Sequence, residues 1–213
     1  MQNPSSGWLK STGITNPGAK GPNSHQNSRT LTPAHTIPEK RPQMRLFIAI
    51  TFTEDMLDAL GEIQDDLRRS DVRGSYTPRE NLHMTLAFIG EYDDPEQIVE
   101  VMRKVPLRSF SIKLSGYRPF KDMMFAEFEE NENLRDYVKR LRAALLDEEI
   151  PFDRKKFLPH VTLIRRAECV KGKALLPEFG DSESMRVNGI SVMKSERGKH
   201  GMIYSEVGYV GAF

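Results

Sequence analysis

Residues 82–86 read Leu-His-Met-Thr-Leu, and residues 159–163 read Pro-His-Val-Thr-Leu. The pattern His-x-Thr-Leu, with an apolar residue at x, thus occurs twice in a chain of 213 residues. Both copies lie in short runs of apolar and β-branched residues, which are typical of strands. No convincing longer repeat surrounds them. The two runs predict a pair of similar strands, one in each half of the folded part of the chain.

Side chains alternate between the two sides of a strand. His83 and Thr85 should therefore share one side of the first strand, and His160 and Thr162 one side of the second. The opposite sides should hold apolar residues, namely Met84, Leu86 and Phe88 in the first strand and Val161 and Leu163 in the second. If the polar sides face each other across a groove, that groove contains two imidazoles and two hydroxyl donors.

Such a groove has the groups that chemistry on a phosphodiester needs. One imidazole accepts a proton from water, and the other donates a proton to the leaving oxygen. The hydroxyls of Thr85 and Thr162 donate hydrogen bonds to the non-bridging oxygens. The motifs therefore predict His83 and His160 as an acid–base pair and the two threonines as phosphate-binding residues.

Each motif alone has a simpler interpretation, because a single strand histidine is usually a half-buried or surface residue. Both motifs together, each followed by leucine, are harder to attribute to chance. A zinc site is a second alternative, but it needs three or four ligands. The sequence has no His-x-His, His-Glu-x-x-His or Cys-x-x-Cys pattern. We therefore expect neither a metal nor another cofactor.

The remaining elements favour an antiparallel α+β fold, because strands and helices are mixed without strict alternation. Thr53, Asp94 and Asn131 are suited to cap three helices. The first of these should end near Arg69 and the last should be long and amphipathic. Strand-like runs are found at residues 45–52, 82–89, 110–114, 123–128 and 160–165, and residues 187–193 and 202–207 predict a hairpin.

Residues 1–43 differ from the rest of the chain. They are rich in Asn, Pro, Ser, Thr and Gly, and we expect this segment to be a disordered extension before a folded domain of residues 44–213. It holds five basic residues and one acid, so the remainder of a chain with net charge +1 carries −3, which excludes a globally basic nucleic-acid binder. Cys169 is the only cysteine and no run is long enough to span a bilayer. We expect a cytoplasmic monomer without a membrane partner.

The doubled motif resembles the two-histidine (2H) phosphoesterase superfamily, and within it the RNA 2′,3′-cyclic phosphodiesterase family, also known as the 2′–5′ RNA ligase family. Three stretches carry the resemblance: residues 44–50 (MRLFIAI), 81–90 (NLHMTLAFIG) and 159–166 (PHVTLIRR). Their order and spacing cover nearly all of residues 44–209. The resemblance implies a bilobal, pseudo-twofold fold with an antiparallel sheet and helices in each lobe and a central cleft.

The resemblance also implies a function. It assigns catalysis to His83, Thr85, His160 and Thr162, without a cofactor, on RNA with 2′,3′-cyclic phosphate ends, giving a 2′-phosphate. Members also join or split 2′–5′ linkages in tRNA halves, so tRNA fragments are expected partners. The family often has Trp shortly before its first motif, where this chain has Tyr76.

Contacts to the rest of an RNA are predicted from residue type. Cations bind phosphates and aromatic rings stack on bases. Tyr76 and Phe47 are candidate stacking rings, although aromatic residues more often pack in a core. Arg165 and Arg166 follow the second motif, and if the strand continues, Arg166 shares the side of His160 and Arg165 does not. A solvated charge at a strand end is an equal alternative for either arginine.

Two other functions stay open. The substrate is either an RNA end or a small cyclic nucleotide, or the chain is a non-catalytic module that binds RNA ends. Binding alone does not require two titratable imidazoles, which favours an enzyme.

Overall fold

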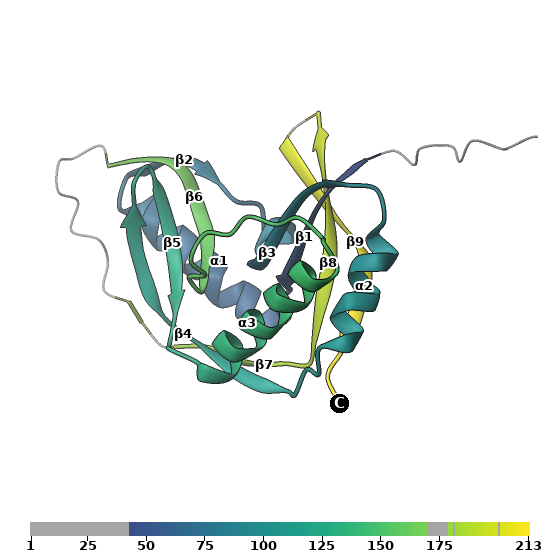
Figure 1. Ribbon diagram of the computed structural model, residues 1–213. Coiled ribbons are helices and arrows are strands. Elements are labelled where there is room, and N and C mark those ends of the chain that lie inside the picture. The colour runs from purple at the N-terminus through teal and green to yellow at the C-terminus, as the bar shows by residue number, and fades with distance from the viewer. Residues whose placement is uncertain (1–42, 170–178, 181, 200) are drawn as a thin grey trace, which may run out of the picture. The chain divides into compact units, whose positions relative to one another are not determined.

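The computed structural model describes residues 43–169, 179–180, 182–199 and 201–213, which belong to one compact unit formed by residues 40–213. The expected disorder of residues 1–43 concerns a segment that, apart from Gln43, lies outside the described residues. In the described part, the strands form two antiparallel sheets and the helices pack against them, as expected of an α+β protein (Figure 1).

The two sheets contain four and five strands, in the orders β3-β1-β8-β9 and β2-β6-β5-β4-β7. The first sheet is made of β1 (Met44–Ile50), β3 (Met84–Tyr92), β8 (Gly189–Gly198) and β9 (Gly201–Gly211). The second is made of β2 (Val72–Tyr76), β4 (Phe110–Phe120), β5 (Met123–Phe128), β6 (His160–Cys169) and β7 (Ser184–Val187). Each sheet combines strands from both halves of the chain. β6 begins at His160, whereas β3 begins at Met84, so that His83 directly precedes the first motif strand.

Three α-helices lie in the described residues: α1 (Glu54–Arg69), α2 (Pro95–Lys104) and α3 (Glu132–Asp147). All three begin at the predicted caps. Asp94 and Asn131 accept hydrogen bonds from the third residue after them, at 3.0 and 2.9 Å, and Thr53 does so at 3.5 Å. A short 3₁₀-helix (Arg79–Asn81) leads to the first motif. The sequence-based prediction of the helices is therefore confirmed.

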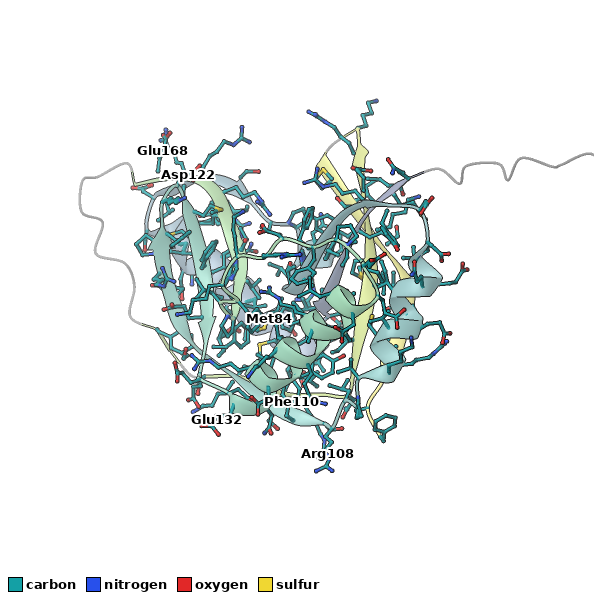
Figure 2. The ribbon with its side chains drawn as sticks, in the orientation of Figure 1. Met84, Arg108, Phe110, Asp122, Glu132 and Glu168 are labelled. Carbon is teal, nitrogen blue, oxygen red and sulfur yellow. The ribbon has the colours of Figure 1, made fainter. Side chains whose placement is uncertain are left out.

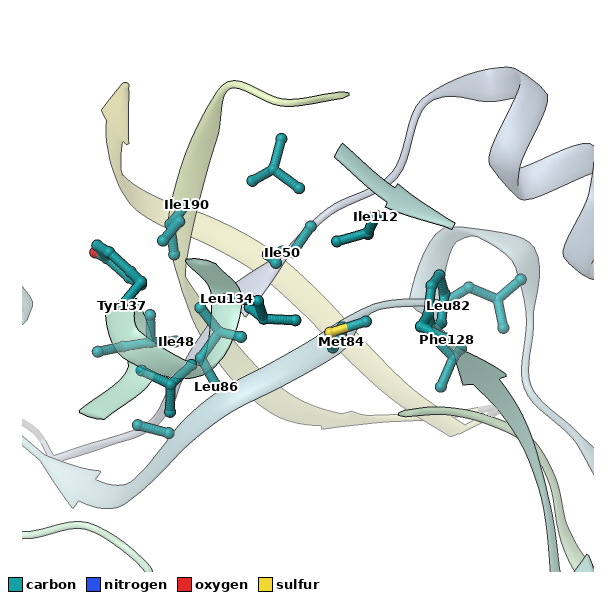
Figure 3. Close-up of a cluster of buried hydrophobic side chains, with 14 of the residues drawn as sticks. Ile48, Ile50, Leu82, Met84, Leu86, Ile112, Phe128, Leu134, Tyr137 and Ile190 are labelled. Atoms are coloured by element: carbon teal, nitrogen blue, oxygen red, sulfur yellow. The ribbon is translucent and has the colours of Figure 1, made fainter. Parts of the chain in front are cut away.

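The apolar sides of both motif strands contribute to one large core. Met84, Leu86, Val161 and Leu163 are fully or almost fully buried. Figure 3 shows Met84 and Leu86 beside Leu134 of α3, which approaches the same cluster. Because the apolar side of each strand is fixed in the core, its polar side is fixed as well.

Both motif strands contain a β-bulge at the leucine that ends the motif. In β3, Thr85 pairs with Ala49 and Ala87 pairs with Ile48, so Leu86 is an extra residue. In β6, Thr162 pairs with Phe125 and Ile164 with Met124, so Leu163 is an extra residue. A bulge shifts the alternation of side chains by one position. Leu86 and Ala87 are accordingly both buried, as are Leu163 and Ile164.

The bulge in β3 places Phe88 on a different side of the strand from the one predicted. Phe88 was predicted on the apolar side with Met84 and Leu86. After the extra residue it instead packs in a small separate cluster with Phe47, Ala49, Met193 and Tyr204. The prediction for Phe88 was wrong because simple alternation does not continue past Leu86.

Candidate active site

The four motif residues lie on one pocket. This pocket has a volume of about 690 Å³ and is lined by residues of both sheets and of the segment between β2 and β3. Its lining comprises residues 75–78, 80–81, 83, 85, 160, 162, 165, 199 and 201–204. Figure 2 shows Met84, which directly follows His83, in the interior between the two sheets. The structure therefore brings His83, Thr85, His160 and Thr162 together from opposite halves of the chain.

Both imidazoles are held by the same backbone interaction. The Nδ1 atom of His83 lies 2.7 Å from the carbonyl oxygen of Asn81, and Nδ1 of His160 lies 2.7 Å from that of Leu158. A carbonyl oxygen only accepts hydrogen bonds, so in each ring Nδ1 carries the proton. Each neutral ring then keeps Nε2 as its acceptor. Both histidines are thus prepared to exchange protons through Nε2.

A phenylalanine ring supports each histidine. The ring of Phe47 is centred 4.7 Å from that of His83, and the ring of Phe125 lies 4.1 Å from that of His160. Phe47 is 3% exposed and is not among the lining residues. The structure therefore places this predicted RNA contact beneath His83, where it orients the imidazole. Tyr204 adds a perpendicular ring 5.1 Å from His83.

Burial lowers the pKa of both imidazoles below the ordinary histidine value of 6.5. The hydrogen bonds to Asn81 and Leu158 act in the opposite direction and raise the pKa of the two rings. The positive charge of Arg165 lowers the pKa of both histidines further, because it disfavours a second cation nearby. Both rings therefore favour the neutral form at neutral pH.

The pocket contains Arg165 and not Arg166, contrary to the side predicted from simple alternation. The extra residue Leu163 shifts the following side chains by one position, which turns Arg165 to the side of His160 and Thr162. Arg166 has a φ of +52°, in the left-handed region, and both arginines are exposed. The expectation that Arg166 shares the side of His160 was thus wrong.

Tyr76 lines the pocket but is held by other contacts. Its hydroxyl donates a hydrogen bond to the Val72 carbonyl at 2.7 Å, and the Arg68 guanidinium lies 4.1 Å from its ring centre. Burial raises the pKa of this phenol. Part of its ring also packs on the core, so only one portion of Tyr76 is available to a ligand.

Sequence reasoning missed the contribution of the β8–β9 hairpin. Met202, Ile203 and Tyr204 line the pocket, and the side chain of Asn81 donates a hydrogen bond to the Met202 carbonyl at 2.8 Å. Asn81 is 121 residues from Met202, so no local pattern indicates this contact. The only available signal is the position of Asn81 directly before the first motif.

Among the residues that the structure describes, no group of three or more His, Cys, Asp or Glu side chains is arranged to hold a metal ion. In the same part of the chain, no helix has the length and apolar character to cross a bilayer.

Comparison with known proteins identifies the family. Residues 56–199 match the model of the 2′-5′ RNA ligase superfamily. The chain belongs to this superfamily. Proteins named RNA 2′,3′-cyclic phosphodiesterase are similar in sequence: that of Thermus thermophilus is 34% identical over 179 residues (76% of this chain, 87% of the relative). That of Thermotoga maritima is 32% identical over 133 residues (57% and 70%).

Solved structures agree with the fold. Escherichia coli LigT in complex with 3′-AMP superposes with a TM-score of 0.69 at 19% identity, over 80% of this chain and 98% of LigT. The protein TT0787 of Thermus thermophilus gives a TM-score of 0.60 at 28% identity, over 79% and 97%. The α+β fold expected from the sequence is that of this superfamily.

Proposed function

We propose that this chain hydrolyses 2′,3′-cyclic phosphates at RNA ends and leaves a 2′-phosphate. One observation carries the proposal: two histidines, each with Nδ1 bonded to a backbone carbonyl, line one pocket with two threonines. The family supports the same conclusion, since several relatives are named RNA 2′,3′-cyclic phosphodiesterase.

The two imidazoles act in the same step, one as the base and the other as the acid. Nε2 of the neutral histidine accepts a proton from water as the water oxygen attacks phosphorus. The bond from phosphorus to the 3′ oxygen breaks, and the protonated histidine donates its proton to that oxygen. The product is a 2′-phosphomonoester with a free 3′-hydroxyl. Both motifs read His-x-Thr-Leu, so the motif itself does not say which of His83 and His160 is the base.

The phosphate is held by three side chains on the pocket. The hydroxyls of Thr85 and Thr162 donate to the non-bridging oxygens, which carry more charge in the transition state. Arg165 is near enough to both histidines to lower the pKa of each. Its guanidinium therefore attracts the phosphate into the space between them. An anion bound there also offsets the effect of Arg165 and favours protonation of one imidazole.

The pocket suits a nucleotide at the end of a longer chain. Its volume of about 690 Å³ lies in the range of ordinary ligand pockets. Met202 and Ile203 are 40% and 53% exposed at its rim and offer apolar surface to a base. Together with Tyr76 they form the surface on which we place the base of an RNA end, such as that of a tRNA fragment.

The test is hydrolysis of a 2′,3′-cyclic mononucleotide and of a short RNA with the same end, both in EDTA. We expect turnover of both, a higher kcat/KM for the RNA, and only the 2′-phosphate product. The variant lacking both imidazoles, His83→Ala/His160→Ala, is the control for contaminating nucleases. Binding of the RNA without turnover by the wild-type protein would support the non-catalytic alternative. A second assay with 2′–5′ linked RNA reports on ligase or cleavage activity.

A further inference from the structure

The bulge in β3 is bound by an arginine of α3. Arg142 donates to the Leu86 carbonyl through Nε at 3.1 Å and Nη2 at 2.9 Å. Its third nitrogen, Nη1, donates to the Lys155 carbonyl at 2.7 Å. Lys155 lies in the segment that leads to His160. One side chain thus joins the bulge beside His83 to the chain that approaches the other histidine.

The bulge in β6 has the reciprocal arrangement. Gln64 of α1 is 5% exposed, and its Nε2 donates to the Leu163 carbonyl and to the Thr77 carbonyl, both at 2.9 Å. Thr77 lies in the segment that leads to His83. Its own hydroxyl donates to the Thr162 carbonyl at 2.7 Å. The bulge beside His160 is therefore joined to the chain that approaches His83.

These two side chains occupy equivalent places in the fold. Gln64 lies ten residues after Glu54, the first residue of α1, and Arg142 lies ten residues after Glu132, the first residue of α3. Both helices have 16 residues. Each side chain reaches the carbonyl of the extra leucine in a histidine strand. This agreement of position and contact goes beyond the general requirement that buried carbonyls be hydrogen-bonded.

The bulges lie three residues after the histidines and one residue after the threonines, so a shift of either bulge also moves the backbone that carries these side chains. An extra residue increases local twist and disrupts the ladder. Donors that bind its carbonyl restrict that freedom. Each donor also binds the segment before the opposite histidine. The two histidines are therefore restrained relative to each other.

We propose that Gln64 and Arg142 are positioning residues, which set the relative placement of His83 and His160 by bridging each bulge to the opposite histidine segment. This role rests on the proposed function of the pocket. Neither side chain is among the residues that line the pocket. Their influence reaches the reaction only through the two histidines.

The experiment replaces each donor by an unbranched side chain that donates nothing, Gln64→Met and Arg142→Met. Small displacements of catalytic groups have large kinetic effects, so we expect kcat to fall about 10- to 100-fold while KM changes little. Arg142→Lys, which keeps one donor site but not the fork, should recover part of the loss. Matched controls are Ile63→Ala and Val138→Ala, which disturb the buried faces of the same helices.

All variants are compared well below their unfolding midpoints, so that a loss of stability alone leaves kcat unchanged. Imidazole ¹⁵N NMR titrations give a second measurement that does not depend on turnover, with signals assigned through His83→Ala and His160→Ala. We expect the two Met variants to change the apparent pKa or the Nδ1–H tautomer of both rings, and the controls to change neither. If kcat and ring signals of the Met variants match those of the controls, the inference is overturned. If the wild-type protein turns over no cyclic phosphate, the proposed function fails, while the NMR measurement still decides the positioning role.

Discussion

The two histidine strands carry the same motif and the same extra leucine in different surroundings. β3 is an edge strand of its sheet, whereas β6 lies between β2 and β5. Burial, a phenylalanine ring and the charge of Arg165 act on both histidines. In addition, the ring of Tyr204 lies 5.1 Å from that of His83, whereas the charge of Arg118 lowers the pKa of His160. The comparison shows that the symmetry of the motif does not extend to the environment. The surroundings, and not the motif, must distinguish acid from base.

The largest effect is expected when each imidazole is removed in turn. We expect His83→Ala and His160→Ala each to lower turnover of a 2′,3′-cyclic phosphate by about 10²–10⁴-fold, the usual contribution of a positioned proton-transfer group. An activated aryl phosphodiester then distinguishes the acid from the base, because its leaving group needs no proton. The variant that lacks the acid should lose least on this substrate. Near wild-type hydrolysis of the cyclic phosphate by either variant would show that the pair is misassigned.

A smaller effect tests the bulge in β6. Arg165→Met should lower kcat/KM by about 10- to 100-fold, since a hydrogen bond to a charged group contributes about 1.5–3 kcal/mol. Arg166→Met is the matched control, with the same change one position along the strand, and should stay close to the wild type. Equal losses in the two variants would contradict the assignment of Arg165 to the phosphate.

Substitution of the two threonines compares the contributions of the two strands to phosphate binding. Thr85→Val and Thr162→Val keep the shape of the side chain and remove the donor, so each should cost about 1–3 kcal/mol in transition-state binding. Thr85→Ser and Thr162→Ser retain the hydroxyl and serve as controls. Steady-state kinetics of the four variants give the comparison. Full activity in both valine variants would reduce the threonines to strand-forming residues.

The pH dependence should show the mildest effect, a displaced maximum. The base must start neutral and the acid protonated, which gives a bell-shaped curve. Because kcat/KM reports the free enzyme, in which the pKa of both histidines is lowered, we expect its maximum on the acid side of 6.5. A bound phosphate favours the protonated acid, so the curve for kcat should lie at higher pH. The limbs belong to a coupled pair and are not assigned to single residues without the alanine variants. A rate independent of pH from about 5 to 9, with chemistry limiting, would exclude the mechanism.

Local sequence signals predicted much of this fold. Asp94 and Asn131 identify helix starts because a cap acts within three residues of its own position. The duplicated His-x-Thr-Leu motif located four of the polar residues that line the pocket, His83, Thr85, His160 and Thr162. These predictions succeed because each depends on alternation or capping within one element.

Other features depend on partners remote in sequence. The strand β2 has the sequence Val-Arg-Gly-Ser-Tyr and forms only because β6 pairs with it, and β7 is a four-residue strand on β4. β2 has no apolar alternation, and the alternation of β7 (Ser-Met-Arg-Val) is only four residues long, too short to predict a strand by itself. The bulge at Leu163 has no local signal either, since Leu163 and Ile164 are both ordinary strand residues. For that reason the neighbouring arginines were assigned to the wrong sides.

The backbone bonds at the two Nδ1 atoms impose a limit on the catalytic cycle. Each imidazole can release or take up a proton only at Nε2, because the hydrogen bond to the carbonyl of Asn81 or Leu158 keeps a proton on Nδ1. After one proposed turnover the former base is protonated and the former acid is neutral. The pair then has the protonation state that promotes closure of the ring from the 2′-phosphate. Return to the hydrolytic state requires proton exchange with water that enters the pocket, so the rate of this resetting step sets an upper bound on kcat.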